Sequence, residues 1–416
     1  MNAIVLSIGS ELTTGQQSDT NAGWLAAELT RLGATVVRMV TVGDELESLR
    51  CAIRESQQMA DLLVATGGLG PTADDLTRFS LADAVGQPLE ENGEALAQIR
   101  DFFARGQRPW HEANRVQAMI PAGCRVIPNR RGTAPGIHVP GEREFFALPG
   151  VPSEMKAMFE EYVAPIVVQR TGGAVTWIAR LQTYGMTEAR IGELIEDLMR
   201  RDRNPLVGTS AARGIIGIRL VGKAAADDDA RSLVEADRTE IRRRLGDAVF
   251  GEGEATLEGA VGALLTRESM TVAVAESCTG GLLAKLLTDT PGSSAYFLRG
   301  YVVYANAAKT ELLNVPASLI ERFGAVSEEA AKAMAEGCRG AARSDFALSL
   351  TGVAGPSGGS PEKPVGLVYI GFADESCTTV KRLLFGDHLS RQEIRVRACH
   401  AALNLLRLHL LHMAPA

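Results

Sequence analysis

Aromatic residues are scarce in this sequence and make up only 5% of its 416 positions. Proteins that stack the bases of single-stranded nucleic acids depend on such side chains. The chain also lacks an excess of positive charge, because its formal net charge is −7 at pH 7. Phosphate backbones are bound mainly through clustered lysine and arginine. Nucleic acid is therefore not expected as the main partner.

Cysteine is sparse as well. The six cysteines are scattered and form no CxxC pair, which argues against a zinc site and against a disulfide framework. No apolar run is long enough to span a bilayer, and the first residues enter a strand without a basic leader segment. These absences predict no membrane partner and a location in a reducing cytoplasm.

The length exceeds what one hydrophobic core normally supports, and the patterns divide the chain into three domains, 1–170, 171–252 and 253–416. The first domain alternates strands and helices, which predicts a parallel sheet with right-handed crossovers. The strands are expected at 3–8, 35–42, 62–65 and 144–148. The helices are expected at 21–32, 45–60 and 72–85, and a last one follows the turn 149–154 and runs through 168.

The middle segment reads as a small α+β module that spaces the flanking domains. We expect strands at 176–183, 215–221 and 248–250 and helices at 188–200 and 227–245. Gly214–Gly217 matches the letters of a GxxG nucleic-acid clamp. It lies within an apolar strand and both central residues are isoleucine, so we reject that interpretation.

The last segment is again α/β. Its expected strands are 270–274, 295–304, 346–350, 365–373 and 380–385, and its expected helices are 256–267, 327–342 and 391–411. The segment AESCTGG, residues 275–281, falls between an apolar strand and a helix. It delivers Glu276, Ser277 and Thr279 to the carboxyl end of a strand, where open α/β sheets bind ligands. Gly280 and Gly281 allow a substrate to approach the backbone, and the N–H groups that open the helix favour an anion.

Three turns of the first domain are expected to meet at one sheet edge: 9–15, 66–77 and 148–154. Bare backbone at Gly67, Gly68 and Gly70 suits phosphate or ribose contact, and Ser153 of the third turn is a further substrate-binding candidate. The carboxylates are hard oxygen ligands, suited to a divalent cation that bridges a pyrophosphate. The four candidates are Glu11, Asp44, Asp74 and Asp75. Alternatively, Asp74 and Asp75 only cap the helix that they open.

Long ordered motifs carry a resemblance to a known family. SIGSELTTGQQSDTNAGWLA, VGDELESL, TGGLGPTADDLT, EANRVQAMIP, GTAPGI and ALPGVPSEMKAMF resemble the N-terminal domain of the CinA (competence/damage-inducible) proteins. AESCTGG, YANAAK, GAVSEEAA, TGVAGPSGG and KPVGLVY resemble their C-terminal domain. The resemblance implies an α/β three-layer N-terminal domain of molybdopterin-binding-like fold, a KH-like α+β middle module and an α/β CinA domain.

The same resemblance implies two activities. The C-terminal domain of this family deamidates nicotinamide mononucleotide to nicotinic acid mononucleotide and ammonia, without a cofactor. The N-terminal domain resembles an ADP-ribose pyrophosphatase that requires a divalent metal. Here the family's first turn, usually GDEL, reads Gly9-Ser10-Glu11-Leu12, so one acidic contact is lost at Ser10. Two alternatives follow: an N-terminal module that binds a nucleotide or pterin without turnover, and an interaction partner in DNA uptake or repair.

Amide hydrolysis needs a nucleophile, a proton shuttle and stabilisation of an oxyanion. No metal cluster and no suitably placed histidine is evident, so a serine activated by lysine fits better than a Ser-His-Asp triad. Ser277 is the first candidate nucleophile, Thr279 is the second, and Lys309 is the candidate base. Alternatively, Ser277 caps a helix and Lys309 is solvated. Cys278 is interpreted as a buried, inert neighbour.

Further residues are expected around this pair. Tyr304 and Asn306 are expected to orient Lys309 or to hold the ribose, and the turn TGVAGPSGG to approach phosphate or ribose through Thr351, Gly352 and Gly355. Two arginines open the last helix, where they either pair with the substrate phosphate or remain surface charges. They are Arg391 and Arg395. Exposed sheet edges favour a homodimer.

Overall fold

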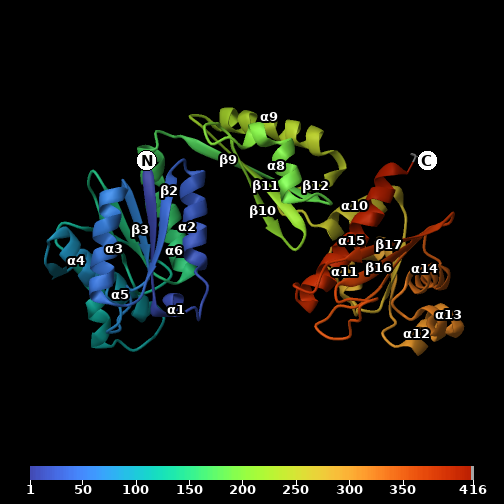
Figure 1. Cartoon of the computed structure of the whole chain (residues 1–416). Coiled ribbons are helices and arrows are strands. Elements are labelled where there is room, and N and C mark those ends of the chain that lie inside the picture. The colour runs from blue at the N-terminus through green and yellow to red at the C-terminus, as the bar shows by residue number, and fades with distance from the viewer. Residues whose placement is uncertain (414–416) are drawn as a thin grey trace. The chain divides into compact units, whose positions relative to one another are not determined.

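The computed structural model describes residues 1–413 and contains three main sheets, one for each domain (Figure 1). Internal contacts divide the chain into two compact units. The first contains residues 1–178 and 221–234, and the second contains residues 179–220 and 235–416. Within residues 1–413, no helix combines the length and the apolar character that crossing a membrane requires.

The N-terminal domain is built on a six-stranded sheet. Its order is β2 (Thr35–Val42), β1 (Asn2–Ile8), β3 (Leu62–Thr66), β8 (Glu144–Leu148), β7 (Gly136–Val139) and β6 (Arg125–Ile127). The first four strands are mutually parallel, as the alternating pattern predicted. The last two are antiparallel additions that the pattern did not predict.

Helices cover both faces of this sheet, because successive strand residues point to opposite sides. Ile4 and Leu6 pack on one side, and Ala3 and Val5 pack on the other. The first face is covered by α3 (Leu46–Met59), α4 (Thr77–Val85) and α5 (Gly93–Arg105). The second is covered by α2 (Thr20–Arg31), α6 (Pro152–Met158) and α7 (Ala164–Arg170), with a π-helical turn at Phe159–Val163 (Figure 1).

Short elements complete this domain. They are α1 (Ser10–Thr13), the antiparallel pair β4 (Leu89–Glu91) and β5 (Met119–Pro121), and a 3₁₀ segment at Glu112–Ala118. The helix expected over 72–85 begins only at Thr77. Residues 72–76 instead form a turn, because the Asp75 carboxylate accepts hydrogen bonds from the amides of Gly70 and Thr72.

The middle domain is a four-stranded sheet with two α-helices. The sheet order is β10 (Leu206–Ala212), β11 (Ile215–Ala224), β9 (Val175–Tyr184) and β12 (Val249–Glu252). The helices are α8 (Glu188–Leu194) and α9 (Asp227–Leu245), and 3₁₀ segments span Glu196–Met199 and Gly246–Ala248. Gly214 lies in the turn between β10 and β11, and Gly217 lies within β11. The GxxG letters therefore do not form a loop between helices.

The C-terminal domain carries a five-stranded sheet. Its order is β14 (Phe297–Val302), β13 (Val272–Glu276), β15 (Phe346–Gly352), β16 (Leu367–Ala373) and β17 (Thr378–Leu384). The first three strands are parallel and the last two are antiparallel. Strand β13 is thus the middle one of the three parallel strands, and its carboxyl end lies between those of β14 and β15.

Successive side chains of β13 point to opposite faces of the sheet, so the hydrophobic core of this domain has two parts. Val272 and Val274 pack with α10 (Leu257–Glu268), α11 (Leu282–Thr288) and α15 (Arg391–His412). Ala273 and Ala275 pack on the other face with α12 (Asn306–Leu313), α13 (Ala317–Phe323) and α14 (Glu328–Ala342). A 3₁₀ segment at Ser293–Ala295 precedes β14. Figure 1 shows α12, α13 and α14 grouped away from α11 and α15.

Candidate functional site

The first candidate site lies at the carboxyl ends of the three parallel strands of the C-terminal sheet. The Ser277 amide donates to the Leu350 carbonyl at 2.9 Å, and the Val303 amide donates to the Glu276 carbonyl at 2.8 Å. These bonds hold the residues that follow β13 and β14 beside the last residues of β15 and β13. Parallel strands in open sheets place ligand-binding residues at this edge.

Glu276 has a local structural role. Its side chain is fully buried, and its carboxylate accepts hydrogen bonds from the backbone amides of Gly281, Leu283 and Ala284 at 3.1, 3.0 and 2.7 Å. These amides belong to the beginning of α11, where N–H groups lack helical partners. The carboxylate expected to contact substrate is therefore committed to the helix N-terminus. Ser277, the cap considered from the sequence, does not fill that role.

Lys309 lies beside Ser277. The Nζ atom of Lys309 is 3.2 Å from Oγ of Ser277, and it donates to the carbonyls of Val303 at 2.8 Å and Tyr304 at 3.3 Å. Only 1% of the Lys309 side chain is exposed. None of the ion pairs found within residues 1–413 includes Lys309. The amine is thus enclosed by neutral acceptors.

This environment makes the amine easier to deprotonate. Burial lowers the pKa of Lys309 because the ammonium loses its hydration. A neutral amine has two N–H groups and one lone pair. The two carbonyls accept two hydrogens, which leaves the lone pair for the Ser277 hydroxyl. The arrangement is suited to removing a proton from Ser277.

The two residues after Ser277 are less suited to nucleophilic attack. The Thr279 side chain is completely buried, and its hydroxyl has no hydrogen-bond partner. Burial raises the pKa of the Cys278 thiol to about 12, so the thiolate is scarce at neutral pH. The position of Cys278 agrees with its interpretation as an inert neighbour.

Tyr304 and Asn306 border the Lys309 site from the segment after β14. Tyr304 is 62% exposed. Its hydroxyl accepts a hydrogen bond from Nη2 of Arg391 at 3.1 Å, while its carbonyl contacts Lys309. Asn306 is exposed at the first position of α12. Tyr304 therefore orients Lys309 through its backbone, and its ring remains open to a ligand.

The two arginines of α15 hold different parts of the site. Arg391 donates from Nη1 to the Gly355 carbonyl at 2.9 Å, in addition to its bond with Tyr304. Arg395 donates to the Thr279 carbonyl from both Nε and Nη2. Arg395 thus fixes the turn that carries Ser277, whereas the exposed Arg391 bridges the segments that follow β14 and β15.

In the turns AESCTGG and TGVAGPSGG, the backbone conformation or close packing requires glycine at several positions. Gly280 and Gly281 have φ angles of 56° and 91°, which L side chains rarely adopt. A side chain at Gly352 would collide with the Leu367 carbonyl, which is 2.5 Å from the ideal Cβ position. Thr351 is buried, and its hydroxyl donates to the Ala325 carbonyl at 2.6 Å. Thr351 is thus engaged within the protein.

The second candidate site is a pocket of 560 Å³ in the N-terminal domain. Six glycine and carboxylate candidates of the first two turns and Asp44, which follows β2, line it: Gly67, Gly68, Gly70, Glu11, Asp74, Asp75 and Asp44. Gly150 and Glu154 of the third turn also line it, so the three turns do meet at one edge. Ser153 is exposed and is not among the lining residues.

The carboxylates of this pocket are engaged to different degrees. Asp75 accepts from the amides of Gly70 and Thr72, both at 2.8 Å, and from the Thr72 hydroxyl at 2.5 Å. It therefore closes the glycine-rich turn. Asp74 is exposed, and hydrogen bonds, first of all from the Thr72 side chain, lower its pKa. Leu76, not either aspartate, precedes the first residue of α4.

Ser10 and Asp44 form a reciprocal pair. The Ser10 amide donates to the Asp44 carboxylate at 2.7 Å, and the Asp44 amide donates to the Ser10 hydroxyl at 3.1 Å. Ser10 thus supplies the acceptor that an aspartate at this position would also supply. What the substitution removes is the second negative charge.

A divalent cation fits this pocket only with help from a substrate. Among residues 1–413, no group of three or more His, Cys, Asp or Glu side chains is arranged to hold a metal ion. Mg²⁺ is commonly held by one or two carboxylates together with substrate phosphates. Asp74 and Glu11, both exposed on the pocket wall, have the chemistry for that mode.

Two buried side chains that the sequence did not bring to attention support this pocket. Arg78 is 1% exposed and donates to the carbonyls of Leu69 and Gly70 at 2.5 and 3.0 Å, which holds the turn from below. Burial lowers its pKa to about 10. Gln117 lines the pocket, and its Oε1 atom has no hydrogen-bond partner. One signal was available, since Gln117 lies within the motif EANRVQAMIP and Arg78 directly follows the motif TGGLGPTADDLT.

Comparison with known proteins matches all three domains to sequence families. Residues 4–169 match the family described as "Probable molybdopterin binding domain", residues 179–251 match "Damage-inducible protein CinA KH domain", and residues 254–410 match "CinA C-terminal domain". A CinA-like protein of Geobacter sulfurreducens is 43% identical over 413 residues, which cover 99% of this chain and 100% of that protein. The chain belongs to the CinA family.

Other proteins are similar to the whole chain or to one part of it. A CinA-like protein of Dictyoglomus thermophilum is 41% identical over 415 residues, which cover 99% of this chain and 100% of that protein. A solved structure of a competence/damage inducible protein from Agrobacterium tumefaciens is 41% identical. It covers 38% of this chain and 94% of that chain, with a TM-score of 0.36. The matches confirm the molybdopterin-binding-like, KH-like and CinA folds expected from the sequence.

Proposed function

We propose that the CinA C-terminal domain hydrolyses the amide of nicotinamide mononucleotide, with Ser277 as nucleophile and Lys309 as general base. The observation that carries this proposal is the buried amine of Lys309, 3.2 Å from the Ser277 hydroxyl and enclosed by neutral carbonyls. The geometry supports a serine–lysine hydrolase, and the choice of substrate comes from the family resemblance.

The reaction would proceed in two halves. Ser277 Oγ attacks the amide carbon while its proton moves to Nζ of Lys309. The tetrahedral intermediate collapses as Lys309 returns that proton to the departing nitrogen, which leaves as ammonia. A water molecule then attacks the ester on Ser277, with Lys309 again accepting the proton. Nicotinic acid mononucleotide departs and Ser277 regains its hydrogen.

The developing oxyanion needs hydrogen-bond donors. The amides of Cys278 and Thr279 directly follow the nucleophile and donate to no other residue within the described chain. The amide after a nucleophilic serine is a common oxyanion donor in hydrolases. We assign these two amides to that role. Arg395 supports it, because it holds the Thr279 carbonyl and thereby the orientation of the turn.

Ammonia release from nicotinamide mononucleotide by the full chain tests this function. Ser277→Ala should reduce the rate to background, while Ser294→Ala, at an exposed serine of the same domain, should leave the rate unchanged. Circular dichroism and thermal unfolding should show that both variants fold. Retained activity in folded Ser277→Ala would contradict the proposal.

A second function is proposed for the N-terminal domain: hydrolysis of the pyrophosphate of ADP-ribose. Three turns with bare glycine backbone and exposed carboxylates line one 560 Å³ pocket, which favours a phosphorylated ligand. A divalent cation carried by the pyrophosphate would neutralise its charge, with Asp74 and Glu11 as the protein ligands. The Gly67–Gly70 backbone would orient the phosphates.

Production of AMP from ADP-ribose with added Mg²⁺ tests this second function. Asp74→Asn should lower the rate by roughly tenfold to a hundredfold, because one charged ligand is lost. Asp101→Asn, at an exposed aspartate on α5 outside the pocket, is the matched control. Tight binding of ADP-ribose without any AMP at several Mg²⁺ concentrations would instead identify a non-catalytic binding module.

A further inference from the structure

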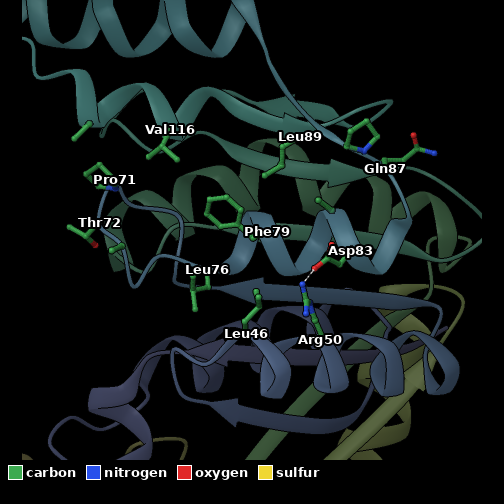
Figure 2. Close-up of a pocket in the computed structure, with 14 residues that line it drawn as sticks. Leu46, Arg50, Pro71, Thr72, Leu76, Phe79, Asp83, Gln87, Leu89 and Val116 are labelled. Carbon is green, nitrogen blue, oxygen red and sulfur yellow. Dashed lines mark ion pairs between the residues drawn. The ribbon is translucent and has the colours of Figure 1, made fainter.

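A larger pocket of 750 Å³ lies beside the proposed pyrophosphate site in the N-terminal domain (Figure 2). It is formed by α3, α4, the turn before α4, and the segments that contain Leu89 and Val116. Its volume falls within the range of ordinary small-molecule sites. The residues given roles in the two proposed reactions lie outside it.

The lining of this pocket is mostly apolar. The apolar members are Leu46, Pro71, Ala73, Leu76, Phe79, Ala82, Pro88, Leu89, Ala113 and Val116. In Figure 2 the ring of Phe79 lies in the middle of the pocket, between Leu89 and Val116 on one side and Leu46 and Leu76 on the other. Phe79 is 37% exposed, so part of an aromatic ring on a helix faces a cavity wide enough for a second ring.

The charged side chain of Arg50 in this pocket is neutralised by neighbouring carboxylates. Arg50 forms ion pairs with Asp83 and with Glu47, so its positive charge is already balanced. Figure 2 shows Arg50, Asp83 and Gln87 toward one end of the pocket and Thr72 at the other. A phosphate would meet no uncompensated cation here. A neutral ring with hydrogen-bonding edges fits both the apolar middle and the polar ends.

One turn separates this pocket from the proposed pyrophosphate site. Pro71 lines both pockets. Thr72 and Ala73 face the apolar pocket, whereas Asp74 and Asp75 line the acidic one. A ligand that crosses Pro71 would therefore have phosphates on the glycine and carboxylate side and an apolar group on the Phe79 side.

We propose that this pocket binds the neutral heteroaromatic base of a nucleotide whose phosphates occupy the neighbouring glycine-rich pocket. The proposal rests on the function proposed for the N-terminal domain and assigns the base end of its substrate. The base stacks on Phe79, and Thr72 or Gln87 binds its polar edge. Stacking on an aromatic side chain contributes to binding for any base, so the site selects a planar ring over an aliphatic group.

Two variants test the base site through binding and turnover. Phe79→Ala should raise the KM for ADP-ribose about tenfold, because stacking on the ring is lost. Ala113→Trp, at an exposed position on the opposite wall, should fill the pocket and have the same effect. Inhibition by ribose 5-phosphate, which lacks a base, should be the same in both variants as in the unmodified chain. Met39→Ala, 51% exposed on β2 and outside both pockets, should change neither quantity.

Adenosine binding, followed by saturation-transfer NMR, separates this inference from the proposed hydrolysis. Adenosine should bind the unmodified chain and bind Phe79→Ala at least about tenfold more weakly. Absence of AMP production with adenosine binding intact would contradict the hydrolysis and leave the base site supported. An unchanged KM in both pocket variants, or no adenosine binding to the unmodified chain, would overturn the base site. So would a Phe79→Ala variant that changes only the oligomeric mass, because the pocket would then be an interface between copies of the chain.

Discussion

Two glycine-rich turns of this chain, Gly67–Gly70 and Ser277–Gly281, each follow a central parallel strand, yet they present different reactive groups. The C-terminal turn faces Lys309, whose amine is buried and contacts only neutral oxygen atoms. The N-terminal turn is bordered by exposed or backbone-bound carboxylates. The structure thus removes water from the amine of the first turn, whereas it leaves carboxylate charge of the second turn open to solvent.

The largest expected effect concerns the base of the C-terminal site. Lys309→Ala should lower kcat for ammonia release by about a thousandfold, in the range that general-base removal usually produces. Lys285→Ala, at an exposed lysine paired with Asp289 on α11, should leave kcat unchanged. Loss of activity in both variants would show a general effect of lysine removal. It would then give no special role to the buried amine that distinguishes the C-terminal turn from the N-terminal turn.

Glu276 offers the next test, because it stabilises the C-terminal turn from inside. Glu276→Ala leaves three backbone amides of α11 without their buried acceptor, and should lower the free energy of opening of this helix by about 3 kcal/mol. Hydrogen exchange of the amides at 283–288 measures that change. Glu311→Ala, at an exposed glutamate of α12, is the control. Unchanged protection would mean that the turn does not depend on this cap.

Substitution of the two arginines of α15 should affect substrates with and without a phosphate differently. Arg391→Ala should lower kcat/KM for nicotinamide mononucleotide about tenfold and leave nicotinamide riboside unaffected, since the exposed guanidinium would pair with phosphate. Arg395→Ala should lower kcat/KM for both substrates equally, because Arg395 fixes the turn of the nucleophile. Equal losses on both substrates in Arg391→Ala would assign it a positioning role as well.

The smallest effect is a change in pH dependence. Burial lowers the pKa of Lys309, and only the neutral amine accepts a proton. The value of kcat/KM should therefore rise with pH as Lys309 deprotonates, with a midpoint below the ordinary lysine pKa of about 10.4. Measurement between pH 6 and 10 with nicotinamide riboside avoids titration of the substrate phosphate. A rate that falls with pH across this range would contradict a lysine base.

Hydropathy patterns were sufficient to predict the parallel strands, because buried strands have strong local signals. The pairing of Ser277 with Lys309 was predicted from the lack of a suitable histidine together with the resemblance to the CinA family, and hydropathy alone would not have given it. The role of Glu276 was not predictable, since the amino-acid sequence does not show that its carboxylate points toward the backbone amides of α11. The same holds for Asp75, which closes its own turn and delays α4 to Thr77. The antiparallel strands β16 and β17 have no local signal for their direction. The Phe79 pocket was missed because its walls come from separate segments.

Trapping of the acyl-enzyme tests the central claim most directly. The full chain is mixed with nicotinamide mononucleotide, quenched in acid within one turnover, digested and examined by mass spectrometry. The account predicts that the nicotinic acid mononucleotide acyl group is attached to Ser277 and is absent from Lys309→Ala. Attachment to Cys278 or Thr279, or steady ammonia release by folded Ser277→Ala, would contradict it.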